Sequence, residues 1–414
     1  MIRVIIADDS SFMRKVLSDV FNEEPDFEVV GTAVNGKDAV NQVLRLKPDL
    51  VTMDVLMPEM DGLKALQMIM EEHPVPVIMI SSLTKKDADE TIKALQYGAV
   101  DFITKTGGSI SRVDTIKDEI LDKARNAAKA KVKKIAINNN ILGKKQEAEN
   151  LKRINILERQ STAKTTRGIG TTSIVASRLK PTAHVTATSR TSSLLSQRSS
   201  VMDKVAKREN PLLKMRQASG AASGGRNKLV VLGTSTGGPK ALQYVVPKLP
   251  ADMPCGMVIV QHMPAGFTKS LAERLNDISS VKVKEAEDME PILPGYVYIA
   301  PGDYHMEITG SGSQRVISLN QKPPLGAHRP AVDIMFDSVV QYGGDVVSVI
   351  LTGMGCDGAA GMKKIKKAGG YIIAESQETC VVYGMPKAVV DAGIADEVLP
   401  VQDIAEAIMN AVRK

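Results

Sequence analysis

The N-terminal part of the chain alternates short apolar runs with longer amphipathic stretches. The apolar runs read IRVIIA, DFEVVGTA, DLVTMD, VPVIMIS and AVDFITK. Each run has the length of a buried strand, and the text after it has helical spacing. Such alternation predicts a doubly wound α/β domain, with a parallel sheet covered by helices. We place this domain at residues 1–122.

A second α/β domain is predicted at residues 228–414. It opens with the apolar run KLVVLG, and later runs read MVIVQ, VVSVILTG and GYIIAES, each followed by helical text. Three shorter β-type runs in the middle read YVYIAP, YHMEI and RVISLN, and they predict a small antiparallel insertion. The fold class expected is again a doubly wound α/β sheet.

Residues 123–227 lack both periodicities and are rich first in Lys and Arg, then in Ser and Thr. They hold too few large apolar side chains to offset the entropy of ordering, so we expect a flexible linker. Its first part, through about Lys134, is expected to extend the last helix of the first domain. Residues 123–228 carry 24 Lys/Arg and 5 Asp/Glu, whereas the rest of the chain carries 29 and 42.

This charge distribution argues against nucleic-acid binding, because the net charge of +6 arises in the linker and both folded domains are acidic. The linker could touch acidic protein or lipid surfaces, although its composition favours solvated disorder. Three widely spaced cysteines without a CxxC pair argue against disulfides and a thiolate zinc site. No apolar run reaches 18 residues, so we expect a cytoplasmic protein without membrane insertion.

Polar side chains end four strands of the first domain. Asp8 and Asp9 follow the first strand, Asp54 ends the third, Ser81 the fourth, and Lys105 follows the fifth. The carboxyl ends of parallel strands share one edge of a sheet. Crowded carboxylates favour a hard cation, so we predict a Mg²⁺ site at which Asp54 attacks a phosphoryl group. The alternative is that these carboxylates are solvated strand ends.

The segments VIIADDSS, VTMDVLMPEMDG, VIMISS and DFITK resemble the receiver domains of two-component response regulators, which have a flavodoxin-like fold. The resemblance implies phosphorylation of Asp54. It implies metal binding by Asp8, Asp9, Asp54 and the main-chain carbonyl of Leu56, and a phosphorylation-sensitive switch made by Ser81, Phe102 and Lys105. Receivers usually have a proline where this chain has Thr106, which leaves the geometry of that loop open.

A candidate nucleophile follows the first strand of the second domain. The segment GTSTGGPKAL fits G-x-S-x-G, with Ser235 on a strand-to-helix turn that glycines make possible. Glycine-rich turns also bind phosphates. However, this segment is neither a dinucleotide fingerprint nor a P-loop, and the next strand ends in Gln261 rather than in an acid.

A serine nucleophile needs a base, and the chain has five histidines. His73 lies in the first domain and His184 in the linker. His262 ends the strand after the serine strand, which makes it the best candidate. His305 and His328 lie in the irregular middle section, where they could face a substrate or simply be exposed.

Asp357 is the expected partner of the histidine. It follows a strand in the glycine-rich loop LTGMGCDGAAG, whose exposed amides could form an oxyanion hole. The other candidates are weaker. Asp333 and Asp337 are spaced as a solvated helix face, Asp345 as a turn residue, and Cys356 as a loop residue without an activating neighbour.

The order Ser, His, Asp does not fit α/β-hydrolases. The segments GTSTGGPKAL, VIVQHMPAGF, LTGMGCDGAAGM and VVYGMPKAV resemble the catalytic domain of chemotaxis protein-glutamate methylesterases over nearly all of residues 228–414. The resemblance assigns Ser235 as nucleophile, His262 as base and Asp357 as its partner. Thr236 and the Met354 amide lie near the oxyanion site, and Thr234 replaces a commoner alanine.

The resemblance implies a phosphorylation-regulated hydrolase of glutamate γ-methyl esters on the cytoplasmic helices of chemoreceptors, with glutamine deamidation as a second activity. A chemotaxis histidine kinase would be the phosphodonor, and the esterase would need no cofactor. The resemblance also implies that the unphosphorylated receiver covers the esterase cleft. A linker of this length has a reach on the order of 55 Å, so we expect weak autoinhibition. The alternative is a non-catalytic adaptor that binds receptors.

Overall fold

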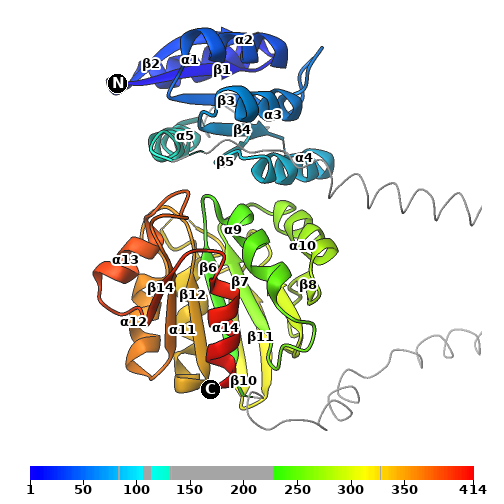
Figure 1. Ribbon diagram of the computed structural model, residues 1–414, viewed down its shortest axis with the longest axis vertical. Coiled ribbons are helices and arrows are strands. Elements are labelled where there is room, and N and C mark those ends of the chain that lie inside the picture. Colours follow the sequence, from blue (N-terminus) through cyan, green and yellow to red (C-terminus); the bar gives the residue numbers. More distant parts are fainter. Residues whose placement is uncertain (83, 106–112, 131, 133–226, 327) are drawn as a thin grey trace, which may run out of the picture. The chain divides into compact units, whose positions relative to one another are not determined.

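The structure is a computed structural model of the 414-residue chain. It describes residues 1–82, 84–105, 113–130, 132, 227–326 and 328–414, although no side chain of residues 113–116 is described. The two predicted domains are coloured blue to cyan and green to red in Figure 1. Most of the predicted linker, residues 131 and 133–226, lies outside the described residues. No described helix is long and apolar enough to cross a membrane.

The first domain is a five-stranded parallel sheet in the order β2-β1-β3-β4-β5. Its strands are β1 (Ile2–Ala7), β2 (Phe27–Ala33), β3 (Leu50–Asp54), β4 (Val77–Ser81) and β5 (Asp101–Thr104). Its helices are α1 (Ser11–Asn22), α2 (Gly36–Leu46), α3 (Gly62–Glu72), α4 (Lys85–Gln96) and α5 (Val113–Ala127). The helix α5 thus runs five residues beyond the predicted end of the domain, as the expected extension of the last helix does, but it ends at Ala127 and not near Lys134.

Alternating side chains of each strand enter different cores, as a sheet buried on both faces requires. On β1, Val4 and Ile6 pack with the α1 residues Leu17 and Phe21. Ile5 packs instead on the opposite face, where α2 and α3 contribute their buried residues. Side chains capping the N-termini of α1, α2, α3 and α4 are Ser10, Asn35, Asp61 and Thr84. Each cap begins its helix at the end of the loop that follows the preceding strand.

The second domain is a seven-stranded sheet in the order β14-β13-β12-β6-β7-β9-β8, and every pairing is parallel. Its strands are β6 (Leu229–Thr234), β7 (Met257–Gln261), β8 (Lys282–Glu285), β9 (Tyr296–Ile299), β12 (Val346–Ile350), β13 (Tyr371–Glu375) and β14 (Glu397–Leu399). The chain starts in the middle, adds strands on one side and then crosses to the other. The loops after β6, β7 and β12 therefore meet at a topological switch point.

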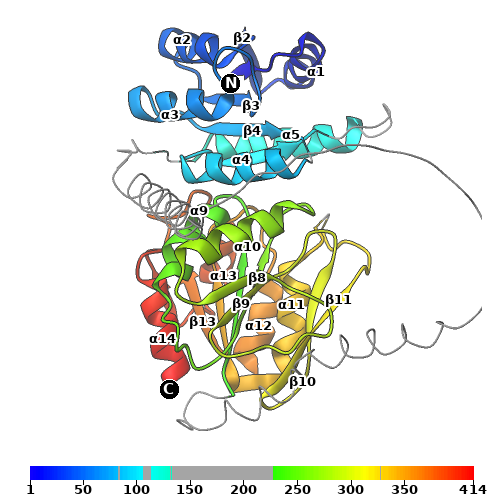
Figure 2. The same cartoon turned by 90° about the vertical axis from the view of Figure 1, so that its right-hand side faces the viewer.

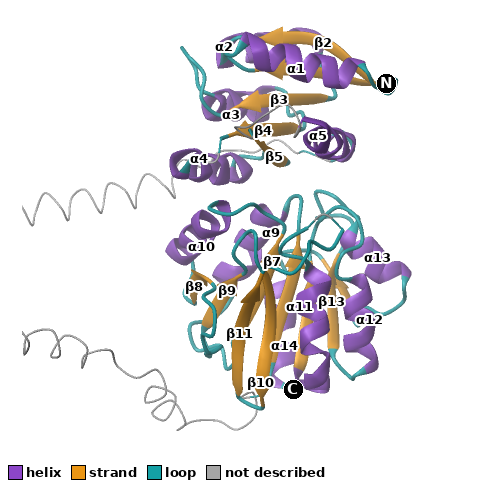
Figure 3. Ribbon diagram, turned by 180° about the vertical axis from the view of Figure 1, so that it is seen from behind, coloured by secondary structure: helices purple, strands orange, loops and turns teal. Residues whose placement is uncertain are grey.

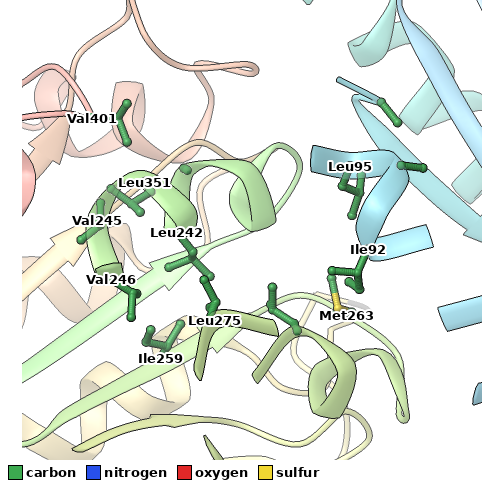
Figure 4. Packing of buried hydrophobic residues seen from close by; sticks show 14 of the residues in the cluster. Ile92, Leu95, Leu242, Val245, Val246, Ile259, Met263, Leu275, Leu351 and Val401 are labelled. Carbon is green, nitrogen blue, oxygen red and sulfur yellow. The ribbon is translucent and has the colours of Figure 1, made fainter. Parts of the chain in front are cut away.

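Helices cover both faces of this sheet (Figure 2). The helices are α9 (Gly238–Val245), α10 (Phe267–Ile278), α11 (Val332–Val339), α12 (Ala359–Lys367), α13 (Met385–Asp391) and α14 (Ile404–Arg413), with short 3-10 turns η2 (Val246–Lys248) and η3 (Val340–Asp345). One face packs on α9, α10 and α14. Figure 4 shows part of this core, including Leu242 of α9, Ile259 of β7 and Leu275 of α10. The other face packs on α11, α12 and α13.

The predicted antiparallel insertion is confirmed as a two-stranded sheet of β10 (His305–Ser311) and β11 (Gln314–Asn320), seen in Figure 3. The run YVYIAP was wrongly assigned to it, because β9 pairs in parallel with both β7 and β8 in the main sheet. The edge strands β8 and β14 were missed. They have only four and three residues, KVKE and EVL, so neither contains the longer apolar run by which buried strands are recognised.

Candidate functional sites

The predicted acidic residues come together at the carboxyl edge of the first sheet. One carboxylate oxygen from each of Asp8, Asp9 and Asp54 lies within 4.8 Å of the others. Asp8 is fully buried, and its Oδ1 accepts a hydrogen bond from the Ser10 amide. Asp54 ends β3, which is the middle strand of the sheet. Three oxygen ligands at this spacing suit a divalent cation such as Mg²⁺.

Lys105 supplies a positive charge to this acid pocket. Its Nζ lies 2.7 Å from Asp54 Oδ2 and 3.0 Å from Asp8 Oδ2. Burial raises the pKa of Asp54 even though Lys105 opposes the shift. Burial alone would lower the pKa of Lys105, but its two carboxylate partners raise it above the ordinary value. The single ammonium thus pairs with two of the three carboxylates, and the pocket keeps an excess of negative charge.

The two other predicted switch residues lie on neighbouring strands. Ser81 ends β4, is fully buried, and its Oγ lies 2.7 Å from the hydroxyl of Thr91 on α4. Phe102 lies on β5 and is buried. Leu56 follows β3 and is 46% exposed. Thr106, the departure noted in the sequence, lies outside the described residues.

The turn that carries Ser235 lies between β6, the middle strand of the second sheet, and α9. Gly237 adopts φ +80°, and a Cβ there would come 2.6 Å from Val381, so the turn admits only glycine. The Ser235 amide donates to the Thr352 carbonyl at 3.1 Å, and the Gly238 amide donates to the Ser235 carbonyl at 2.8 Å. These bonds close the sharp strand-to-helix turn that G-x-S-x-G predicts.

His262 and Asp357 form the expected pair. The strand register aligns Thr234 with Gln261, so Ser235 and His262 each follow one of two paired residues. His262 Nε2 lies 2.7 Å from Asp357 Oδ2. The other ring nitrogen, Nδ1, is buried and has no hydrogen-bond partner within the described chain. Because Nε2 faces the carboxylate, Nδ1 is the nitrogen free to act as a base.

No hydrogen bond joins the Ser235 hydroxyl to His262 among the residues that the structure describes. Catalytic hydrogen bonds are often long without substrate and tighten in the reacting complex. The structure therefore brings the three side chains to one sheet edge and forms the histidine–aspartate half of the relay. We expect the hydrogen bond between the Ser235 hydroxyl and His262 to form when substrate binds.

The Asp357 carboxylate also caps α11. The amide of Val332 donates to Oδ2 at 2.7 Å and that of Asp333 to Oδ1 at 2.8 Å. Burial alone would raise the pKa of Asp357, but the bonds from His262 and the two amides hold it below its ordinary value. A helix N-terminus stabilises a carboxylate in this way. Asp357 therefore stays ionised and fixed in orientation.

The prediction that Asp333 lies on a solvated helix face is wrong, because its side chain is partly buried. Its Oδ1 accepts a 2.7 Å hydrogen bond from the Gly361 amide at the start of α12, and burial raises its pKa. Asp337 does fit that prediction, since it pairs with the exposed Lys364. Asp345 lies in the turn before β12 as expected, and Cys356 is exposed.

Two main-chain amides near Ser235 fit the predicted oxyanion site. Those of Thr236 and Met354 donate no hydrogen bond within the parts of the chain described. Gly353 directly precedes Met354, and a Cβ there would come 2.9 Å from the Ser235 Cβ. The absence of a side chain at Gly353 lets the loop after β12 approach the serine closely.

The two histidines whose roles the sequence left open have different surroundings. His305 is fully buried, with Nδ1 accepting from the Ala331 amide and Nε2 donating to the Pro323 carbonyl, each at 3.2 Å. It is therefore structural. The ring of His328 stacks on His262, with 3.9 Å between centroids and 8° between planes. Burial and the neighbouring His262 lower the pKa of His328 to about 4. His328 is thus an uncharged ring against the candidate base.

Comparison with known proteins gives a consistent result over the whole chain. Residues 230–408 match the CheB methylesterase family, and residues 4–116 match the response regulator receiver domain. The protein-glutamate methylesterase/protein-glutamine glutaminase of Symbiobacterium thermophilum is 41% identical over 413 residues, which is 99% of this chain and 97% of that protein. This chain belongs to the same family. The recognition made from the sequence segments is thereby confirmed.

One further relative is similar over the whole chain, and one solved structure is similar to the second domain. The protein of that name from Pyrococcus horikoshii is 40% identical over 413 residues, covering 99% of this chain and 94% of its own length. The solved catalytic domain of Thermotoga maritima CheB methylesterase is 48% identical and covers 46% of this chain and 99% of its own length, with a TM-score of 0.44. The roles of individual side chains stay predictions, which the geometry above supports.

Proposed function

We propose that this protein hydrolyses glutamate γ-methyl esters on the cytoplasmic helices of chemoreceptors, with Ser235 as nucleophile. The observation that carries this proposal is the pair His262–Asp357, held at 2.7 Å beside the serine turn with Nδ1 left free. An imidazole fixed on one side by a carboxylate, with its other nitrogen unpaired, is the base that an acyl-transfer nucleophile requires. Membership of the family supplies the substrate class.

In the first half of the reaction, His262 Nδ1 removes the Ser235 proton as Oγ attacks the ester carbonyl. The amides of Thr236 and Met354 donate to the oxygen that becomes negative. Asp357 stabilises the imidazolium that forms while remaining ionised itself. The imidazolium then protonates the departing methoxide, which leaves as methanol.

In the second half, water attacks the acyl-enzyme and His262 takes its proton. Collapse of the tetrahedral intermediate returns a proton to Ser235 and releases a glutamate carboxylate. A glutamine side chain can follow the same route, with ammonia as the leaving group. Deamidation depends more strongly on proton donation by His262, because an amide nitrogen leaves only when protonated.

The acid pocket of the first domain is proposed to accept a phosphoryl group on Asp54 from a chemotaxis histidine kinase. Asp8, Asp9 and Asp54 would hold Mg²⁺ together with the Leu56 carbonyl, and the 4.8 Å cluster fits such an ion. When bound, the ion neutralises charge on the phosphoryl oxygens. Lys105 contacts the acceptor carboxylate directly, so it can follow the phosphoryl group once Asp54 is modified.

The bond between Ser81 and Thr91 supports a route for the regulatory signal. It joins the end of β4 to α4, and its rearrangement on phosphorylation would reach the surface of that helix. A protein of this kind would work in the cytoplasm, where the receptor helices and the kinase are found. The linker, residues 123–227, would connect the two domains, and its length predicts that the unphosphorylated receiver inhibits the esterase only weakly.

The test is methanol release from methyl-labelled receptor membranes, with and without a small-molecule phosphodonor. The full-length protein should release methanol faster with the phosphodonor, whereas Ser235→Ala should release none in either case. An adaptor that only binds receptors is the alternative. It predicts receptor binding without methanol release and no labelling of Ser235 by a serine-reactive phosphonate.

A further inference from the structure

A buried glutamate lies beneath the serine turn and has no part in the relay described above. Glu375 ends β13 and has no exposed surface. Its Oε2 accepts a 2.8 Å hydrogen bond from the Thr352 amide, and its Oε1 accepts one of 2.9 Å from the Thr379 hydroxyl. A carboxylate is rarely buried to this degree without a specific role, because its desolvation is costly.

Thr352, the partner of Glu375, contacts all three residues of the nucleophile turn. Its carbonyl accepts from the Thr234 hydroxyl at 2.9 Å and from the Ser235 amide at 3.1 Å. Its hydroxyl lies 3.0 Å from the Thr236 carbonyl, to which it can donate. Thr352 is itself buried. Thr352 therefore holds the amide side of the nucleophile turn, while the Gly238 amide and Gln261 Nε2 bind the Ser235 carbonyl.

Thr352 also begins the segment that carries the expected oxyanion donor. Gly353 and Met354 follow it directly, and Gly353 lies against the Ser235 Cβ. A shift of the Thr352 main chain would thus move the nucleophile and the Met354 amide together. Misplacement by about 1 Å in an active site can reduce the rate about 100-fold.

Main-chain pairing does not reach this point of the sheet. The register of β12 with β13 ends at Ile350 and Ala374. Beyond the end of β12, the Glu375 side chain takes the place of a main-chain partner and accepts a hydrogen bond from the Thr352 amide. Without it the Thr352 amide would be buried without a partner, which costs about 1–3 kcal/mol.

We propose that Glu375 is a positioning residue for the esterase, which holds Thr352 and, through it, the Ser235 turn and the oxyanion amide. This inference rests on the function proposed above and adds a residue that the sequence did not indicate. The two donors to its side chain, the Thr352 amide and the Thr379 hydroxyl, are neutral, and no ion pair to Glu375 occurs among the described residues, so its role needs a hydrogen-bond acceptor at this position rather than a negative charge. Glutamine should therefore replace it, and an apolar residue of similar shape should not.

The experiment compares Glu375→Gln with Glu375→Met in the full-length protein. Glu375→Gln should keep kcat within about 3-fold, whereas Glu375→Met should lower kcat about 10- to 100-fold with little change in KM. In Glu375→Met, the rate of phosphonate labelling at Ser235 should fall by a similar factor. Glu285→Met is the matched control, since Glu285 is also a strand-end acid that accepts from a threonine hydroxyl, at 2.6 Å, but lies on the edge strand β8. It should label at the wild-type rate.

The proposal is overturned if Glu375→Met keeps its kcat, or if Glu375→Gln falls as far as Glu375→Met. If Glu375→Met does not fold, Thr352→Val decides, because it removes the hydroxyl that bonds to the Thr236 carbonyl. It should also lower kcat with KM unchanged, and wild-type kcat in this variant would contradict the inference. Failure of the proposed function looks different: wild-type protein would then not be labelled at Ser235 at all.

Discussion

The acid pocket of the first domain and the relay of the second lie at equivalent places in two parallel sheets but treat charge in opposite ways. In the acid pocket, three carboxylates lie together and one lysine pairs with two of them, Asp8 and Asp54. In the relay, the single carboxylate of Asp357 has three donors, namely the His262 ring and two main-chain amides. The first arrangement leaves negative charge in excess and the second balances it.

The difference fits the role proposed for each site. A site that takes up a divalent cation and a phosphoryl group works best when its own ligands are under-neutralised, so that binding relieves repulsion. A site that moves a proton needs a carboxylate that stays ionised and does not move. The same edge of the same kind of sheet supports both, because the loops, not the strands, decide how many donors meet each carboxylate.

The two sites should be separable by single substitutions, and this is the largest effect we expect. Ser235→Ala should reduce esterase turnover by about 10⁴-fold or more, because the nucleophile is lost. The Ser235→Ala variant should still be phosphorylated by a small-molecule phosphodonor to the wild-type extent. Asp54→Asn should do the reverse, abolishing phosphorylation while keeping the basal methanol release. Loss of both activities in either variant would mean that the two domains do not carry separate chemistry.

The balanced carboxylate provides the next prediction. Asp357→Asn should lower kcat about 10³- to 10⁴-fold, because an amide NH₂ cannot accept from both His262 and the α11 amides, and the ring loses the tautomer that leaves Nδ1 free. The measurement is methanol release together with circular dichroism. Asp337→Asn on the exposed face of the same helix is the control, and it should keep full activity.

The sequence located most of both sites because their residues follow strands. The acid pocket, Ser235, His262 and Asp357 all come directly after apolar runs or in the glycine-rich loop after one, and strand order then brings them together. Apolar runs located twelve of the fourteen strands described here; β8 and β14 were too short to be recognised, and β9 was assigned to the wrong sheet. A buried strand is easily seen in a sequence, and its neighbour in the sheet is not.

Residues whose role depends on one contact could not be predicted in this way. Glu375 looks like any strand-end acid until its bond to Thr352 is known. His328 lies two residues before Pro330 in an irregular segment, and no local sequence pattern indicates that it stacks on His262. Asp333 has the spacing of a surface residue, yet it caps α12. These contacts join segments far apart in the chain, and no local pattern encodes them.

The stack of His328 on His262 makes a prediction of intermediate size. His328→Ala should lower kcat about 10-fold, because the base loses a planar contact worth about 1 kcal/mol and becomes free to turn. His328→Phe keeps a flat ring and should recover most of the activity. The pKa of His328 is about 4, so the ring is neutral above about pH 5. Above that pH, His328→Phe and wild type should therefore have the same pH profile, and a shifted acid limb would instead mean that the charge of His328 matters.

The smallest effect tests the excess charge of the acid pocket through stability. Asp8→Asn removes one of three crowded carboxylates, while the amide oxygen still accepts from the Ser10 amide. In buffer without divalent cations it should stabilise the first domain, by about 1 kcal/mol, because repulsion falls. Added Mg²⁺ should stabilise wild type more than Asp8→Asn, since ligand binding stabilises in proportion to affinity. Calorimetry with and without Mg²⁺ measures both.

Asp357→Asn should instead lower the stability of its own domain, because two helix amides and a histidine lose their acceptor. If Asp8→Asn destabilised its domain as well, the charge contrast between the two sites would be wrong.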